Sequence, residues 1–450
     1  MSLARLRTVS EKHATASPMV LPGVWQHGTV VCSLLINASI YIVIARALGP
    51  QIFGSYLFAQ WLATITIPVI GTGMSTLISR QIAEIQSHEP PRLIAGIFYF
   101  LWYRQHRSIL LYCLTYMLLS FLLAHFFHLF TSGLLLLVGL STLPLLLSSV
   151  AGTTLRSMRR IDLLSMLHLF YVLLALFFVI VATQINGEPM EAFILAFALA
   201  STITLILAVI CVIRLLPLEQ AMQPGLFLRE RLTYSLNHSW LTFLLDAIVW
   251  QRSELLLLAF WHRPAELGCY ALGAIISTKV IGLAPALFSR WLFPLVIYYM
   301  PAHRYLNPYD AFVKTSCYMI FLAVPICTLL IIFCPTMIQH SLGNAYLSIV
   351  QPLRILLIAT AFGSIATVSL THLAGSKYLS TAKTQHMQRW QNIGVVGLKV
   401  SLTIPFVILW GITGAAIASA IAQITSALIT VFLCNSLLKR HDALFFEDIL

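Results

Sequence analysis

The sequence predicts an all-α polytopic membrane protein, with twelve transmembrane helices in two six-helix lobes related by a parallel pseudo-two-fold repeat. Three observations lead to this prediction. The 450 residues are 59% hydrophobic and only 9% charged, a balance foreign to soluble domains. Apolar runs of about 20 residues, the length that crosses about 30 Å of hydrocarbon as a helix, recur along the whole chain. The motif Pro-x-x-apolar-Gly-x-Tyr occurs twice, at Pro50 to Tyr56 and at Pro264 to Tyr270.

The apolar runs and the repeat together define the expected organisation. The predicted spans are 23–45, 56–79, 108–130, 133–155, 163–183, 191–213, 238–260, 269–299, 312–334, 346–373, 391–410 and 412–437. One motif copy follows the first span and the other follows the seventh, so six helices per half give both halves the same topology. The expected regions are a cytoplasmic tail 1–22, an N-terminal lobe 23–214, a linker 215–237, a C-terminal lobe 238–438 and a tail 439–450.

The basic residues set the expected orientation. Lys and Arg resist translocation and stay in cytoplasmic loops. With a cytoplasmic N-terminus, 20 of the 27 basic residues fall in inner segments or, for Lys314, at the inner end of a span, and only Arg46 and Arg263 fall in outer loops. An even number of helices then places both termini in the cytoplasm. Most of the net charge of +12 is therefore explained by topology and by attraction to anionic lipid headgroups, and no nucleic-acid partner is expected.

Seven charged residues lie within predicted spans and away from the span ends, where an unpartnered charge costs on the order of 3 kcal/mol or more. They are the bases Arg252, Lys279, Arg290, Arg354 and Lys399 and the acids Asp246 and Glu254. Five bases against two acids leave an excess of positive charge that side-chain pairing cannot neutralise. The excess predicts a water-filled cavity with an anionic guest, because arginine donates paired hydrogen bonds that suit phosphate oxygens.

The roles expected within this group differ. Arg252, Arg290, Arg354 and Lys399 are the candidate guest contacts. Lys279 belongs to the same substrate site and is also the natural counter-ion for Asp246 or Glu254. Either acid could carry a coupling proton, since burial and a nearby lysine act on a carboxyl in opposite directions. The alternative is that the charges form buried pairs that only fix helix packing.

The eight cysteines are scattered singly, without a CxxC pair or metal-ligand spacing. No metal and no cofactor is expected.

Several short motifs carry a resemblance to a known family. They are Ala45-Arg-Ala-Leu-Gly49-Pro50-Gln-Ile-Phe-Gly54-Ser-Tyr56, Gly71-Thr-Gly73, Ile78-Ser-Arg80, Leu155-Arg156, Glu266-Leu-Gly268-Cys-Tyr270, Leu292-Phe-Pro294 and Gly411-Ile-Thr-Gly414-Ala-Ala. In this order and placement the chain resembles the polysaccharide flippases of the multidrug/oligosaccharidyl-lipid/polysaccharide exporter superfamily, which includes the bacterial O-antigen flippases.

The resemblance implies two lobes facing each other in a V, alternating access, and no enzymatic activity. The implied substrate is an undecaprenyl-pyrophosphate-linked oligosaccharide, moved from the cytoplasmic to the periplasmic leaflet of the bacterial inner membrane. The implied partners are membrane lipids and the polysaccharide polymerase machinery, and the protein is expected to be a monomer.

Other functions fit the sequence less well. Cation-coupled multidrug exporters of similar fold usually place an acid in the first helix, whereas this first span offers Asn37 and no acid. Lipid II flippases are similar but usually have two further helices. A polymerase or ligase of lipid-linked glycans needs a sizeable outer loop, and no predicted outer loop here is long.

Overall fold

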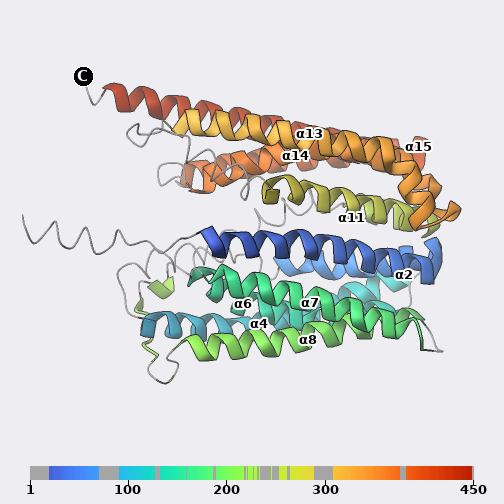
Figure 1. The fold of residues 1–450 in the computed structure, drawn as a ribbon, viewed down its shortest axis with the longest axis horizontal. Helices are drawn as coiled ribbons and strands as arrows, with labels where there is room; N and C mark the ends of the chain where they lie inside the picture. The colour runs from blue at the N-terminus through green and yellow to red at the C-terminus, as the bar shows by residue number, and fades with distance from the viewer. Residues whose placement is uncertain are drawn as a thin grey trace, which may run out of the picture.

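The structure is a computed structural model in which every described element is helical (Figure 1). It describes residues 20–69, 91–126, 132–158, 160–185, 189–216, 221–226, 228–230, 253–260, 264–287, 308–375 and 382–447, and the single positions 219, 233 and 245.

The helices form two groups that lie side by side (Figure 1). The first group contains α2 (Val20–Val69), α4 (Pro91–Phe126), α5 (Ser132–Ser141), α6 (Leu143–Ser157), α7 (Ile161–Ala182) and α8 (Pro189–Leu215). The second contains α10 (Glu254–Phe260), α11 (Pro264–Leu287), α13 (Pro308–Ser341), the 3-10 helix η3 (Asn344–Ile349), α14 (Val350–Gly375) and α15 (Ala382–Glu447). Among these elements α2 makes the main contacts with the other group, through α10, α11 and η3.

Nine helical stretches within the described ranges are long and apolar enough to cross a membrane. The multi-pass prediction is therefore confirmed at this level, whereas the number twelve stays a prediction. Two of the helices are too long for one straight crossing. The 50 residues of α2 would extend about 75 Å as one straight helix, more than twice the hydrocarbon thickness.

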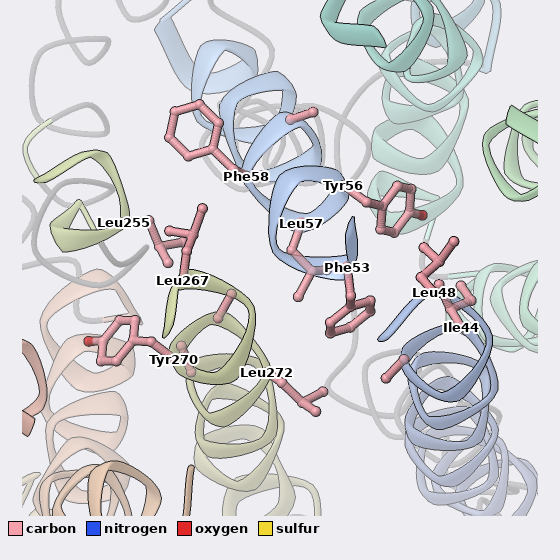
Figure 2. Close-up of a cluster of buried hydrophobic side chains, with 14 of the residues drawn as sticks. Ile44, Leu48, Phe53, Tyr56, Leu57, Phe58, Leu255, Leu267, Tyr270 and Leu272 are labelled. Carbon is pink, nitrogen blue, oxygen red and sulfur yellow. The ribbon is translucent and has the colours of Figure 1, made fainter. Parts of the chain in front are cut away.

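The chain turns inside α2 at Gly49, which has φ 71° and ψ 167°. Only glycine adopts this left-handed φ without strain. Helix resumes at once at Pro50, which lacks an N–H group and so loses nothing at the start of a helix. The prediction of a loop at residues 46–55 is therefore wrong, because Gly49 alone makes the turn between the two parts of α2. Figure 2 shows the two parts of α2 as separate runs, with Ile44 and Leu48 on one and Tyr56 to Phe58 on the other.

A second glycine turn interrupts α15 at Gly411, with φ 56° and ψ −130°. It falls between the predicted spans 391–410 and 412–437. Elsewhere α7 and α8 agree closely with the predicted spans 163–183 and 191–213. The predicted span 133–155 is divided into α5 and α6 at Thr142, just before Pro144, whose ring prevents an uninterrupted helix.

The described part of the predicted linker packs on the start of α4. The Met222 backbone N–H donates to the Arg92 carbonyl at 3.0 Å. The Arg229 guanidinium lies 5.3 Å from the ring centre of Phe100, a cation–π distance. The linker is therefore attached to the first helix group.

Candidate functional site: a cavity between the two helix groups

The two copies of the repeated motif meet at the contact between the helix groups. A Cβ atom added to Gly54 would lie 2.3 Å from the Pro264 carbonyl oxygen, and one added to Gly268 would lie 2.1 Å from the Pro50 carbonyl oxygen. Each glycine thus receives the backbone of the other copy, which is the geometry of a pseudo-two-fold contact. Only glycine permits so close an approach of two backbones.

The tyrosines of the motif are buried among other side chains. Tyr56 is 2% exposed and Tyr270 is fully buried. Figure 2 shows the Tyr270 ring on the side of α11 that faces away from α2. Its hydroxyl is used inside the second helix group.

Further hydrogen bonds join the groups close to Gly49. The Arg46 guanidinium donates to the carbonyls of Ser341 and His340, the latter at 2.7 Å. These carbonyls end α13, where no further helical N–H is available to them. The Tyr346 hydroxyl donates to the Ala45 carbonyl at 2.8 Å. The end of the bundle that contains Gly49 is therefore closed in this conformation.

A cavity of about 450 Å³ lies between α2, α10 and α11. It is lined by Tyr41, Leu57, Gln60, Trp61 and Thr64 from α2, Leu255 from α10, and Ala271, Ala274, Ile275, Thr278 and Lys279 from α11. The wall from the first half is polar and aromatic but uncharged. Lys279 is the charged residue among the lining side chains. Such a mixture of apolar surface with a few polar groups is typical of a ligand site.

Lys279 also borders a second cavity, of about 270 Å³. This cavity is almost entirely apolar and extends between the first part of α2, α11, α13 and α14, where Leu34, Leu272 and Leu330 contribute to its lining. Half-buried Lys279 therefore lies where the first cavity, which has polar side chains in its wall, adjoins the second, apolar cavity. Neither ion pair found in the described part of the chain involves Lys279.

Other polar side chains line the same cavity as this lysine. Tyr41 and Gln60 are two of them, both from α2. The Gln60 Oε1 atom is buried without a hydrogen-bond partner among the residues described. The site thus offers donors and acceptors beside one cation.

A buried ion pair lies directly behind the wall of the cavity. The Lys399 ammonium of α15 is 2.8 Å from Oε2 of Glu254, and their side chains are 1% and 0% exposed. The Tyr270 hydroxyl donates to the other carboxylate oxygen, Oε1. Leu255 and Ala271, the next residues along α10 and α11, line the cavity itself.

Glu254 is thus paired with Lys399, and the expected pairing of Glu254 with Lys279 is wrong. Tyr270 lies level with Glu254 on the adjacent helix. Lys279 follows nine residues later, about 13 Å further along α11, which is beyond the reach of the carboxylate. The pair also uses the charge of Lys399, which sequence reasoning had counted among the unpaired guest contacts.

Arg354 has a local partner on the neighbouring helix. Its Nε atom donates to the Ile331 carbonyl at 3.2 Å. That carbonyl has no helical donor, because the residue four positions later is Pro335, which lacks an N–H group. Arg354 does not line the cavity described above. The intramembrane arginine therefore satisfies a backbone group that proline leaves free.

The remaining predicted site residues, Asp246, Arg252 and Arg290, lie outside the described residues. Sequence reasoning missed Tyr270 as the hydrogen-bond donor to Glu254. The repeat could have pointed to Tyr270, since a motif shared by both halves is a candidate for the contact between them.

Comparisons with known proteins bear on the fold. No protein-family model and no curated protein sequence matches the chain. Among solved structures, the lipid II flippase MurJ in an inward closed conformation is similar with a TM-score of 0.66 and 13% identity, over 92% of this chain and 87% of that one. An inward-facing multidrug resistance MATE family transporter of the MOP superfamily gives a TM-score of 0.61 and 13% identity, over 93% and 99%.

A third similar structure is a MOP superfamily transporter from Pyrococcus furiosus described as having a binding pocket of reversed polarity. Its TM-score is 0.56 at 12% identity, over 93% of this chain and 95% of that one. The three similarities cover nearly the full length of each chain, at identities too low to transfer a function. The chain has the same fold as these three solved structures.

Proposed function

We propose that the protein is a flippase for an undecaprenyl-pyrophosphate-linked oligosaccharide, an O-antigen or related repeat unit, which it moves across the bacterial inner membrane by alternating access. The observation that carries the proposal is the cavity between the helix groups with Lys279 in its wall. An ammonium group inside a membrane protein needs a counter-charge. The pyrophosphate of a lipid-linked glycan would supply it.

The two cavities suit the two ends of such a substrate. Tyr41, Gln60, Trp61, Thr64 and Thr278 offer hydroxyl, amide and aromatic groups to sugars. Lys279 would hold the pyrophosphate where this space meets the apolar one. Arg252 and Arg290 are proposed as further phosphate contacts. Arg354 and Lys399 are proposed as contacts only in a conformation that frees them from their present partners.

The same proposal includes the arrangement of the membrane spans. The protein has twelve transmembrane helices in two six-helix lobes, 23–214 and 238–438, which are joined by the linker 215–237, and both termini are cytoplasmic. The protein works as a monomer beside the polysaccharide polymerase machinery. The distribution of basic residues and the two glycine turns inside α2 and α15 support this count.

The alternative is a multidrug exporter of the same fold. Two aromatic rings, Tyr41 and Trp61, in the cavity wall favour it, because flat cationic drugs stack well on such rings. The ammonium of Lys279 in the same wall opposes a cationic guest. A polymerase or ligase is the weaker alternative.

Measurements on cells that lack the protein distinguish these proposed functions. Membranes are extracted and the undecaprenyl-linked saccharides are weighed by mass spectrometry. The flippase proposal predicts accumulation of one complete repeat unit together with loss of surface polysaccharide. Unchanged lipid-linked saccharides together with new sensitivity to cationic drugs would move the assignment to the exporter.

A further inference from the structure

We propose that Arg46 holds the end of the bundle near Gly49 closed, because its charge joins the carboxyl ends of two helices that would otherwise repel each other. The inference rests on the alternating access proposed above, and it adds a residue that controls the opening of one end. Arg46 lies outside the cavity that Lys279 lines.

Two helices end at this contact, one from each helix group. The first part of α2 ends at the turn on Gly49, which has φ 71°. Helix α13 ends at Ser341, just before the turn on Gly343, which has φ 87°. The carboxyl end of a helix carries about half a negative charge, which arises from carbonyls without a helical donor. Placing two such ends together is unfavourable unless a cation lies between them.

Arg46 supplies a cation at this place. It lies in the last turn of the first part of α2, where a positive charge stabilises the end of its own helix. Its guanidinium also donates to the carbonyls of Ser341 and His340, the latter at 2.7 Å. One charged side chain therefore stabilises both helix ends, and it can do so only while the two ends lie together.

Tyr346 makes the reciprocal contact from the second helix group. Its hydroxyl donates to the Ala45 carbonyl at 2.8 Å. Its ring meets the Phe53 ring edge-on, with the ring centres 6.5 Å apart. Ala45 precedes the turn of α2 and Phe53 follows it, so the buried tyrosine fills the corner between the two parts of the helix. Opening of this end has to remove Tyr346 from the corner and Arg46 from the end of α13.

The two side chains should contribute differently to closure. A hydrogen bond from a charged donor contributes more than one between neutral groups, so Arg46 should favour the closed form more than the Tyr346 hydroxyl does. Arg46 is also exposed, and its replacement leaves the packing inside each helix group unchanged. The residue therefore sets the balance between the closed and open forms, on which the rate of alternating access depends.

The experiment measures this closure without any substrate, so its outcome is independent of what the protein transports. Spin labels are attached at Ile52→Cys on α2 and Leu347→Cys on η3, two exposed positions near the contact, in a full-length chain whose eight native cysteines are replaced. The distribution of distances between the labels is measured in lipid nanodiscs. Thermal unfolding of each variant is measured alongside, to show that it is folded.

We expect the parent protein to give mainly the short distance of the closed form. Arg46→Gln removes the charge but keeps a polar side chain, and should raise the ratio of open to closed protein by about 10-fold or more. Arg46→Lys keeps the charge and should retain most of the closed form. Tyr346→Phe should shift the ratio in the same direction as Arg46→Gln, but by less. Arg160→Gln, which changes the arginine of the exposed Arg160–Asp162 pair, is the matched control and should resemble the parent.

Three outcomes would overturn the proposal. They are the same distance distribution in Arg46→Gln as in the parent protein, an equal loss of the closed form in Arg46→Lys and Arg46→Gln, and an equal change in Arg160→Gln. None of these bears on the flippase proposal, which is tested by the lipid-linked saccharides.

Discussion

Lys279 is the residue on which the proposed anion site depends. Its ammonium lies in the wall of the cavity and has no carboxylate partner in the part of the chain described. Lys279→Ala should lower export by about 10- to 100-fold, the loss of one charge-assisted contact to phosphate. The measurement is surface polysaccharide per molecule of protein in the membrane.

The matched controls for this prediction are a conservative and a distant change. Lys279→Arg keeps the charge and should retain most export. Lys314→Ala removes an exposed lysine on α13 and should have no effect. Equal export by Lys279→Ala and the parent protein would contradict a role for this lysine in holding the substrate.

Arg354 gives a second prediction at the scale of single residues. Arg354→Leu should destabilise the protein by about 1–3 kcal/mol, because the Ile331 carbonyl is left without a donor. In a Pro335→Ala background residue 335 regains its N–H group, so the cost of Arg354→Leu should become small. Thermal unfolding of the four proteins in detergent gives the coupling energy. If Arg354→Leu lowers the stability equally in the parent protein and in the Pro335→Ala background, the arginine does not act through the Ile331 carbonyl.

At the scale of elements, the two copies of the repeated motif allow α2 and α11 to approach each other closely. Gly268→Leu should allow folding of each helix group but prevent closure at this contact, because a Cβ atom already meets the Pro50 carbonyl at 2.1 Å. Spin labels at Ile52 and Leu347 should lie further apart than in the parent protein, and export should be lost.

Gly282→Leu is the control on the same helix, because nothing lies within 4 Å of a Cβ atom at Gly282. It should show the parent distance and normal export. The opposite result, an unchanged distance in Gly268→Leu, would mean that the glycine contact does not hold this end closed.

Elements with strong local signals could be predicted from the sequence, and contacts between distant elements could not. The apolar runs located α7 and α8 almost to the residue. The loop after the first span was predicted too long, because the sequence does not reveal that Gly49 alone completes the turn. The motif copies were recognised as a repeat, yet their mutual contact depends on how two halves of a chain pack.

The candidate site could likewise be predicted only in part from the sequence. The excess of basic residues predicted a cationic cavity, which stays a prediction; Lys279 is one of the residues that line the cavity between the helix groups. The partner of Glu254 was predicted wrongly, since pairing depends on the register of three helices. The predicted spans also left residues 261–268 as the connection, whereas α11 begins at Pro264. The role of Arg354 could have been inferred from Pro335, had the two helices been known to touch.

At the scale of the whole molecule, the proposed count of twelve transmembrane helices makes a topological prediction. Reporters fused at both ends of the chain should lie in the cytoplasm, whereas reporters fused within residues 261–263, ahead of α11, should lie outside. A C-terminal reporter that is active outside would show that the count of twelve is wrong by one and would reverse the orientation of the later loops.

The most direct test of the account is the affinity of the purified protein for the proposed head group. Binding of undecaprenyl pyrophosphate, undecaprenol and a lipophilic cation is measured in nanodiscs, for the parent protein and for Lys279→Ala. The account predicts that undecaprenyl pyrophosphate binds tightest, and that the variant loses about 10-fold or more of this affinity while undecaprenol is unaffected. Tighter binding of the cation, or equal affinity of parent and variant for undecaprenyl pyrophosphate, would contradict an anion site between the two helix groups.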